Sequence, residues 1–352
     1  MAAENEKSAI NVAVIGCGGI SNVHMRALGS VPYAKVVALC DVQKDRALSH
    51  MEKYGCAGAV AYGDYREAIA REDVDLVDIV TPHSAHARMA IDALNAGKYV
   101  LCEKPMATRK EDALAMIAAD ARRRLGIVFQ NRYNQSAREC KRLIESGALG
   151  KVRAVKANVT WHRGEDYYAS DAWRGTWSQE GGGTLINQSI HTIDLLYCLC
   201  GPFHSIKGAI SRDLLADAIE VEDNAHAVIK FESGVVGLLH ASNNYGADDP
   251  PRITIHCEKG VLELFGDTLW RVDGDDVEVL VRRKPVTTGA KAVYGNSHET
   301  LIADFCACAR SGGSFWLDGR EGYHAIWAVL SIYESSLSNR WVRYEQPPAA
   351  RP

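Results

Sequence analysis

Short apolar runs alternate with amphipathic stretches through the first third of the chain, and this alternation limits the folds that are open to it. The runs occupy residues 10–15, 35–40, 76–80, 99–102 and 127–129. Stretches such as 84–96 and 111–124 lie between them and carry apolar residues at helical spacing. Buried strands that alternate with helices form a parallel sheet covered on both faces. The sequence therefore predicts an α/β fold that begins with a doubly wound parallel sheet.

A different pattern begins near Lys151. Longer, β-branched runs follow one another at residues 152–161, 224–231, 235–242, 252–257 and 277–282. Turn signals such as Glu232-Ser233-Gly234 separate neighbouring runs, as in strands joined by hairpins. Consecutive strands with short connections predict a second, mainly antiparallel sheet. Helices are expected at 298–311 and 320–338, before a Pro-rich end.

The composition excludes several classes of protein. Charged residues make up 24% of the 352 and the formal net charge is −4, a balance that does not favour nucleic-acid binding. The ten cysteines have no repeated spacing, which predicts reduced thiols rather than a disulfide framework. Residues 1–7 are polar, and no segment has the length and apolar character of a membrane span. We therefore expect a cytoplasmic protein without membrane or nucleic-acid partners.

A glycine-rich turn follows the first predicted strand. Its residues are Gly16, Gly18, Gly19 and Ile20. Such glycines let the backbone approach a pyrophosphate, whose charge is stabilised by the N-terminus of the next helix. The second predicted strand ends at Asp41, where a carboxylate accepts hydrogen bonds from a ribose and repels a 2′-phosphate. The pair predicts NAD and favours it over NADP, while a helix N-cap at Asp41 and the nearby Arg46 leave alternatives open.

Two further strand ends place polar residues at the same edge of the sheet. Thr81, Pro82 and His83 follow the run at 76–80, with His86 in the next helix, and Glu103 and Lys104 follow the run at 99–102. Open α/β sheets bind ligands at the carboxyl ends of their strands. We expect cofactor contacts here, the alternatives being a solvated lysine and structural histidines. Because no Cys, Asp or Glu at ligand spacing accompanies the histidines, we expect no metal ion.

A second polar group lies in the back half, where Gly181-Gly182-Gly183 leads into a predicted helix. In a regular helix, Asn187 and His191 lie one turn apart on one face, and Asp194 follows a turn later. Three isoleucines, at 186, 190 and 193, fill the opposite side. The polar stripe and its glycine-led start favour a catalytic His191 over a core histidine.

These features together resemble the glucose–fructose oxidoreductase and inositol dehydrogenase family, Gfo/Idh/MocA. They comprise the Gly16 turn, Glu103-Lys104-Pro105, Arg132 and the helix with His191. The likeness runs from Ile10 to about Tyr344. It implies a Rossmann NAD-binding domain at 1–130, with a closing helix that returns from the C-terminal region. It also implies a substrate-binding and oligomerisation domain at 131–345 with an open-faced sheet, followed by a flexible tail at 346–352.

The resemblance also implies a site between the two domains. Lys104 and His191 would hold the reacting hydroxyl, and the Lys104–Pro105 bond would be cis. Oxidation of a secondary alcohol needs a base near its O–H, and Lys104 suits this role if burial lowers its pKa, with His191 assisting. Asn187 stands where inositol dehydrogenase-like members place an aspartate, and an amide orients but takes no proton. In this respect the chain is similar to members that oxidise C3 of pyranosides or nucleotide sugars.

Aromatic and basic side chains complete the expected site. Their aromatic rings stack on sugar faces and their guanidinium groups bind carboxylates or phosphates, the alternative being that they pack a loop onto the sheet. The expected substrate contacts are Lys104, Arg132, Tyr133, His162, Arg163, Tyr168, Asn187 and His191. The expected cofactor contacts are Gly16, Gly18, Gly19, Ile20, Asp41, Thr81, Pro82, His83, His86, Glu103, Lys104, Arg132, Trp173 and Arg174.

The sequence thus predicts an NAD-dependent oxidoreductase that oxidises a secondary hydroxyl, at C3, of a pyranose sugar, glycoside or nucleotide sugar. One alternative is a redox-neutral lyase or hydrolase in which tightly bound NAD makes a transient 3-keto intermediate. Others are an inositol dehydrogenase and a non-enzymatic NAD-binding regulator. Because an open sheet face needs covering, residues 235–242 and their neighbours predict a homodimer or homotetramer.

Overall fold

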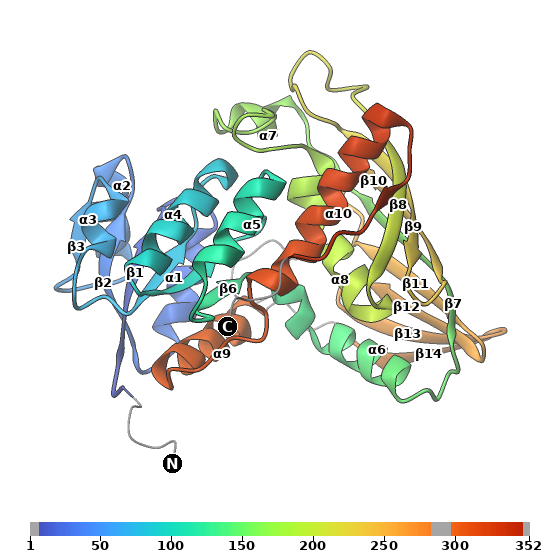
Figure 1. The fold of residues 1–352 in the computed structure, drawn as a ribbon, viewed down its shortest axis with the longest axis horizontal. Helices are drawn as coiled ribbons and strands as arrows, with labels where there is room; N and C mark the ends of the chain where they lie inside the picture. Colours follow the sequence, from blue (N-terminus) through green and yellow to red (C-terminus); the bar gives the residue numbers. More distant parts are fainter. Residues whose placement is uncertain (1–6, 283–296, 348–352) are drawn as a thin grey trace.

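The computed structural model describes residues 7–282 and 297–347, which form two sheets with helices packed around them (Figure 1). The first sheet contains β1 (Ile10–Ile15), β2 (Ala34–Cys40), β3 (Val60–Tyr62), β4 (Leu76–Ile79), β5 (Tyr99–Cys102) and β6 (Leu125–Ile127). All of its pairings are parallel, in the order β3-β2-β1-β4-β5-β6. The predicted doubly wound α/β fold is therefore confirmed. The N-terminal residues 1–6 and residues 348–352 of the predicted tail lie outside the described residues.

Helices connect these parallel strands. They are α1 (Ser21–Gly29), α2 (Lys44–Lys53), α3 (Tyr65–Ile69), α4 (His83–Asn95) and α5 (Lys110–Ala119). A late helix, α9 (His298–Arg310), packs against α1 and β1. The strand order reverses between β1 and β4, so the turns that follow these two strands lie side by side at the switch point, where open α/β sheets bind ligands.

The second sheet has nine strands in the order β14-β13-β12-β11-β7-β10-β9-β8-β15. Their bounds are β7 (Val152–Thr160), β8 (Phe203–Ser211), β9 (Asn224–Phe231), β10 (Val236–Ser242), β11 (Arg252–Cys257), β12 (Gly260–Phe265), β13 (Thr268–Asp273), β14 (Asp276–Val281) and β15 (Val342–Arg343). Only β7 and β10 pair in parallel, which confirms the mainly antiparallel sheet.

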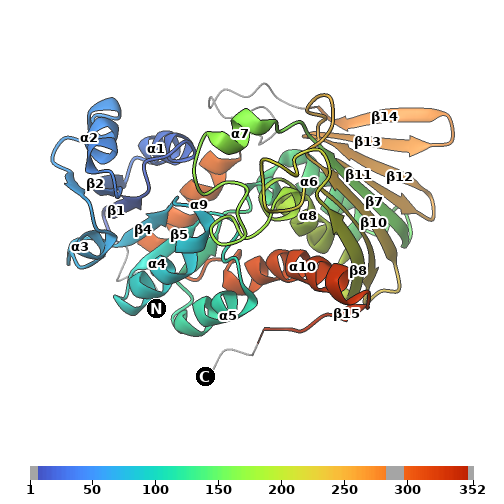
Figure 2. The same cartoon turned by 90° about the horizontal axis from the view of Figure 1, so that it is seen from above.

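Helices cover one face of this second sheet (Figure 2). The remaining helical segments are η1 (Gln130–Tyr133), α6 (Gln135–Glu145), α7 (Glu165–Ala169), η2 (Thr184–Ser189), α8 (Ile190–Cys200) and α10 (Gly319–Ser338). Helix α10 packs on β8 and also contacts α5 and β6, so it joins the two sheets. On the far face, Val236 and Leu238 of β10 are 42% and 54% exposed. None of the helices in the described ranges has the length and apolar character of a membrane span.

Three predicted elements differ from the structure. The strand expected at 127–129 lies at Leu125–Ile127, because the chain after it turns into the 3-10 helix η1. The helix expected to end at residue 124 ends at Ala119, since Asp120 Oδ1 accepts a hydrogen bond from the Arg124 N–H and Arg123 turns to φ 53°. The glycine-led helix begins as a wider π-helical segment, η2, before α8. Strands β8, β12 and β13 were not among the predicted runs.

Candidate active site

Lys104 stands where β5 ends and lies against the second half of the chain. Its Nζ donates hydrogen bonds to the main-chain oxygen of Asn187, at 2.9 Å, and to its Oδ1, at 3.2 Å. The following peptide bond to Pro105 is cis, as the family resemblance implied. Burial lowers the pKa of Lys104, with Arg174 acting in the same direction and the carboxylates of Glu103 and Glu180 opposing it. The structure therefore brings a partly buried ammonium group to the predicted edge of the sheet.

His191 lies on α8 in the same region and is 6% exposed. Its Nε2 is 3.5 Å from Gln130 Nε2, and the Phe129 ring meets it edge to face. Burial lowers the pKa of His191 to about 3, helped by the charge of Lys104, so its imidazole is neutral at pH 7. Its buried Nδ1 has no hydrogen-bond partner among the described residues. A buried polar atom without a partner is costly, so this atom fits a bound polar ligand.

Asn187 is held by a carboxylate that the sequence analysis missed. Its Nδ2 donates to Glu180 Oε1, and Glu180 Oε2 accepts the N–H of Gly175. Glu180 is fully buried and directly precedes the three glycines. The one signal for Glu180 in the sequence was its position directly before the three glycines. Only the fold shows that its carboxylate lies close enough to Lys104 to act on its pKa.

Another buried carboxylate shapes the start of this helix. Glu222 accepts the N–H groups of Gly183 at 2.8 Å and Leu185 at 2.9 Å. A Cβ atom at Gly183 would collide with the main-chain oxygen of Glu222, so only glycine fits there. The glycine-led start thus brings Asn187 to Lys104, and His191 to Gln130 and Phe129, through a close backbone approach that larger residues would block.

The glycine-rich turn after β1 has the geometry of a phosphate-binding turn. Gly16 has φ +104°, and a Cβ there would lie 2.5 Å from the main-chain oxygen of Val80. At Gly18 and Gly19 an added Cβ would meet no described protein atom within 4 Å, so packing within the chain does not require these glycines. Ile20 stands at the N-cap position of α1. The turn therefore fits a ligand that approaches the backbone closely, as a pyrophosphate does.

Asp41 closes the turn from the neighbouring strand. Its Oδ2 accepts the N–H of Cys17 at 2.9 Å, and its Oδ1 accepts the N–H of Gln43 at 2.8 Å. The N-cap residue of α2 is Gln43, so Asp41 is not the helix cap of the alternative interpretation. Its carboxylate lies next to the glycine turn, at the position where a ribose is bound in Rossmann folds.

The turn after β4 is joined to the loop that carries Glu180. His83 Nδ1 hydrogen-bonds the Glu180 main-chain oxygen at 2.9 Å, and its ring lies 4.9 Å from that of Trp173. His86 is engaged within the protein, with its two ring nitrogens each 2.8 Å from a carbonyl oxygen, those of Pro105 and Thr81. Thr81 and Pro82 precede α4 at the same edge. The predicted cofactor residues of β4 and β5 therefore lie together, with His86 holding the two turns in place.

Glu103 belongs to a buried network of charges rather than to an open surface. His24 Nδ1 lies 2.9 Å from Asp78 Oδ2, and its Nε2 lies 3.1 Å from Glu103 Oε1. Burial disfavours a charged imidazole, but the two carboxylates outweigh it and raise the pKa of His24 to about 10. His24, Glu103 and His298 are the one set in the described ranges whose ligand atoms gather as around a metal ion. In this structure the set is part of an ion-pair network in which His24 bridges the carboxylates of Asp78 and Glu103.

Two predicted ligand residues have other partners. Arg132 forms a two-bonded ion pair with Asp194, at 2.9 and 2.7 Å, and a third bond to Glu321 at 2.7 Å. Asp194 is thereby turned away from the stripe formed by Asn187 and His191. Tyr133 OH donates to Asp304 and accepts from Trp316 Nε1 at 2.8 Å. Because these bonds use all three guanidinium nitrogens of Arg132, the structure gives it a role in joining η1 to α8 and α10.

The predicted sugar-binding stretch forms a layer around Tyr167. The Tyr167 hydroxyl accepts hydrogen bonds from Arg174 and from Asn187 Nδ2, the latter at 3.2 Å, and the Arg174 guanidinium stacks on Trp173 at 4.6 Å. Farther out, Arg163 bonds Asp248 at 2.7 Å, His162 Nδ1 bonds the Tyr245 oxygen at 2.8 Å, and Tyr168 OH accepts from Asn243 at 2.8 Å. Of this stretch, Tyr167, Trp173 and Arg174 thus come close to the residues around Lys104.

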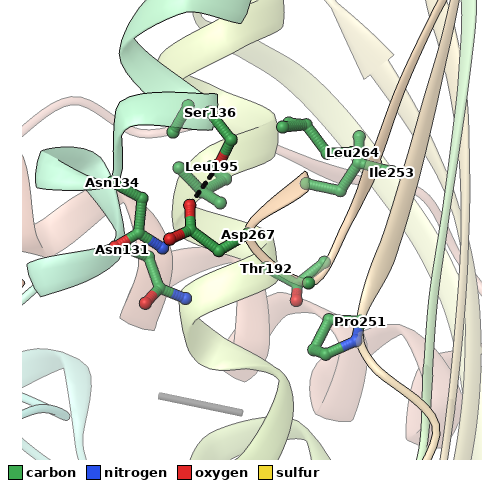
Figure 3. A pocket seen from close by; sticks show the side chains of 11 residues that line it. Asn131, Asn134, Ser136, Thr192, Leu195, Pro251, Ile253, Leu264 and Asp267 are labelled. Carbon is green, nitrogen blue, oxygen red and sulfur yellow. Dashed lines mark hydrogen bonds between the residues drawn. The ribbon is translucent and has the colours of Figure 1, made fainter. Parts of the chain in front are cut away.

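A small cavity lies beside α8, on the side of α6 and of strands β11 and β12 (Figure 3). It has a volume of about 30 Å³ and is lined by Asn131, Asn134, Thr192 and Asp267, with Ser136 Oγ donating to Asp267 Oδ1 at 2.6 Å. This volume suffices for one or two water molecules but not for a sugar. The cavity does not include Lys104, so the site is defined by the side chains at the sheet edge.

Comparison with known proteins agrees with this arrangement. Residues 10–130 match the oxidoreductase family with an NAD-binding Rossmann fold, and residues 137–263 match the GFO/IDH/MocA C-terminal domain. The chain is 34% identical to inositol 2-dehydrogenase of Burkholderia cenocepacia, over 87% of this chain and 95% of that protein. It is 27% identical to levoglucosan dehydrogenase of Pseudarthrobacter phenanthrenivorans, over 96% and 98%.

Among solved structures, the WlbA dehydrogenase from Bordetella pertussis in complex with NADH and UDP-GlcNAcA superimposes with a TM-score of 0.82. It is 29% identical, and the match covers 96% of this chain and 99% of that one. Both family models fit the two halves in the order that the fold shows, and the first is that of an NAD-binding domain. This chain therefore belongs to the Gfo/Idh/MocA family of NAD-binding oxidoreductases.

Proposed function

We propose that the protein is an NAD-dependent dehydrogenase that oxidises a secondary ring hydroxyl, at C3, of a pyranose sugar, glycoside or nucleotide sugar. One observation carries the proposal: after the carboxyl end of β5, the partly buried ammonium of Lys104 lies close enough to His191 to lower its pKa, and His191 Nδ1 has no partner among the described residues. Relatives named levoglucosan dehydrogenase and inositol 2-dehydrogenase support a sugar or cyclitol as the substrate class.

The residues of the cluster match the needs of alcohol oxidation. Bound nicotinamide supplies the hydride acceptor. Lys104 takes the proton of the substrate hydroxyl, because burial lowers its pKa toward the range of a base. Neutral His191 makes a hydrogen bond to the same hydroxyl through Nδ1 and orients it. Asn187 accepts a hydrogen bond from Lys104 and holds it in place. The Asn187 amide does not take the proton itself, because it has no basic lone pair.

The proposed cofactor contacts come from three strand ends and one loop. The Gly16–Ile20 turn would bind the pyrophosphate, Asp41 the ribose, and Thr81, Pro82 and His83 the nicotinamide side. The open space beside Gly18 and Gly19 supports the first assignment. Trp173 and Arg174 would close over the cofactor, which the contact between Trp173 and His83 supports.

Inositol oxidation is the second candidate, because relatives of that name are up to 34% identical. The amide at Asn187 favours the sugar substrate, since a mechanism with a catalytic carboxylate at this position does not apply here. The test is to incubate the pure protein with NAD and panels of pyranosides, nucleotide sugars and inositols. NADH fluorescence and the position of the product keto group distinguish the two.

The same experiment tests the remaining alternatives. Product without net NADH and without added NAD would show a redox-neutral lyase or hydrolase with a transient 3-keto intermediate. NAD binding without any product would show a regulator and overturn the proposal.

We further propose that the protein forms a homodimer or homotetramer through its second sheet. The exposed side chains of Val236 and Leu238 on the face opposite the helices support this arrangement. A monomer by light scattering would contradict it. The ten free cysteines support a cytoplasmic location.

A further inference from the structure

Glu180 is a buried carboxylate with a defined set of partners next to Lys104. Its side chain is fully buried, and its main-chain oxygen accepts a hydrogen bond from His83 at 2.9 Å. Its two carboxylate oxygens have different partners. One accepts the Gly175 N–H and the other accepts Asn187 Nδ2. Both partners are donors, and only a carboxylate offers an acceptor to each.

This arrangement fixes which end of the Asn187 amide faces Lys104. Because Nδ2 must point to Glu180, Oδ1 points to the ammonium at 3.2 Å. A glutamine in place of Glu180 has one acceptor for two donors. Either the Gly175 N–H loses its acceptor, or Asn187 Nδ2 meets another amide nitrogen and the Asn187 side chain turns its donor toward Lys104.

Charges on the elements around Lys104 act with this geometry. Glu103 at the end of β5 and Glu180 in the loop favour its ammonium form, whereas Arg174 and burial oppose it. His83 from α4 and His191 from α8 are neutral at pH 7, because burial lowers the pKa of each. Glu180 is therefore one of two negative charges that balance Lys104.

We propose that Glu180 is a positioning residue for the reaction, which orients the Asn187 amide and balances the charge of Lys104. The inference rests on the proposed role of Lys104 as base.

The first test does not depend on turnover. The full-length protein is labelled with acetic anhydride over a range of pH, and mass spectrometry measures the rate at Lys104, since only the neutral amine reacts. In Glu180→Gln the midpoint moves to lower pH, because the variant loses a charge that favours the ammonium. At a fixed pH below the midpoint, the rate relative to its plateau rises roughly threefold or more.

Glu222→Gln is the matched control. It removes a second buried carboxylate at the same helix start, one that binds Gly183, Leu185 and Tyr333 instead of Asn187. It is expected to leave the Lys104 midpoint unchanged. Equal midpoints in Glu180→Gln and wild-type protein, or equal displacements in the two variants, would overturn the inference.

The second test is the pH profile of kcat/KM. In Glu180→Gln the acidic limb moves to lower pH and the plateau falls, whereas Glu180→Asp keeps the charge and its limb stays closer to that of the wild type. A lower plateau with an unmoved limb would show a merely structural role. If wild-type protein oxidises no sugar or cyclitol, the proposed function fails while the labelling result still decides the inference about Glu180.

Discussion

Lys104 Nζ lies 2.9 Å from the main-chain oxygen of Asn187. This contact joins the edge of the parallel sheet to the π-helical segment η2, which leads into α8. This contact depends on both halves of the chain. The turns that we propose to bind the cofactor come from the first sheet, and the partner of Lys104 comes from the glycine-led segment. A change in either half is therefore expected to alter the chemistry of Lys104. A measurement of cofactor binding distinguishes changes in the turns of the first sheet from changes in the glycine-led segment.

Lys104→Met removes the proposed base but keeps most of the volume of the side chain. We expect kcat to fall by about 10²–10⁴-fold, the usual contribution of a positioned base, while NAD binding stays within a few fold. NADH fluorescence measures the first and calorimetry the second. Lys110→Met, which removes an ion pair with Glu345 at the start of α5, is the control and should keep full turnover. Near-normal turnover of Lys104→Met would contradict the assignment.

His24→Leu is expected to destabilise the protein. Its fully buried imidazole is charged and pairs with Asp78 and Glu103, so the variant leaves the buried Asp78 carboxylate without this counter-charge and leaves Glu103 with Lys104 as its charged partner. Loss of one partner of a buried ion pair costs about 3–5 kcal/mol. Urea unfolding measures the free energy, and the double variant with Asp78→Asn should recover part of the loss. Unchanged unfolding of His24→Leu would show that the network is not charged.

The residues at the sheet edge could be predicted from the sequence because each of them directly follows an apolar strand. Glycines that turn the chain at Gly16 and polar residues at Asp41 and Lys104 follow apolar strands directly, and parallel strands bring their ends together. Once a doubly wound sheet is predicted, these residues must be neighbours. The same reasoning identified Asn187 and His191 as one cluster, since they are one turn apart.

What the sequence could not show depends on pairing across long separations. Arg132 looks like a ligand residue beside a strand end, but Asp194 and Glu321 bind its guanidinium from two other helices. Nothing local to Arg132 indicates these partners. Glu180 is the opposite case, since the sequence does not mark it as a site residue. A single glutamate before glycines has no periodic signal, and its proposed role depends on the packing of its loop on α4.

Stability should fall as the pH drops from about 7 to 5. Burial lowers the pKa of His191 and His324 to about 3 and that of His298 to about 4, whereas an unfolded histidine titrates near 6.5. The unfolded state therefore binds more protons in this range, and each histidine destabilises the fold by up to about 1.4 kcal/mol per pH unit. Glu103 acts in the same direction at lower pH, because its pKa of about 2 lies below that of an unfolded glutamate. Glu222 and Asp120 act in the opposite direction within this range, because burial raises their pKa to about 7 and about 6, but the buried histidines with lowered pKa values outnumber them.

His24 acts in the opposite direction, but mainly above this range. Its raised pKa contributes stability that is fully present below about 6.5 and is lost as the pH rises toward 10. Urea unfolding at pH 5, 6 and 7 checks the acid side, and His191→Gln should have a shallower dependence than the wild type. A free energy of unfolding that does not change between pH 7 and 5 would mean that these histidines are protonated in the folded protein.

Two glycines of one turn are expected to differ in what they do. Gly16→Ala forces a Cβ onto a residue with φ +104° and to 2.5 Å from the Val80 oxygen, so it should destabilise the apoprotein by about 1–3 kcal/mol.

The Cβ added in Gly18→Ala meets no described protein atom within 4 Å, so this variant should leave stability within about 0.5 kcal/mol. It should nevertheless weaken NAD binding by about tenfold, because the added methyl group points into the space through which a pyrophosphate reaches the backbone. Thermal unfolding without cofactor and calorimetric titration with NAD separate the two effects, and equal NAD affinity of Gly18→Ala and wild-type protein would refute the proposed place of the pyrophosphate.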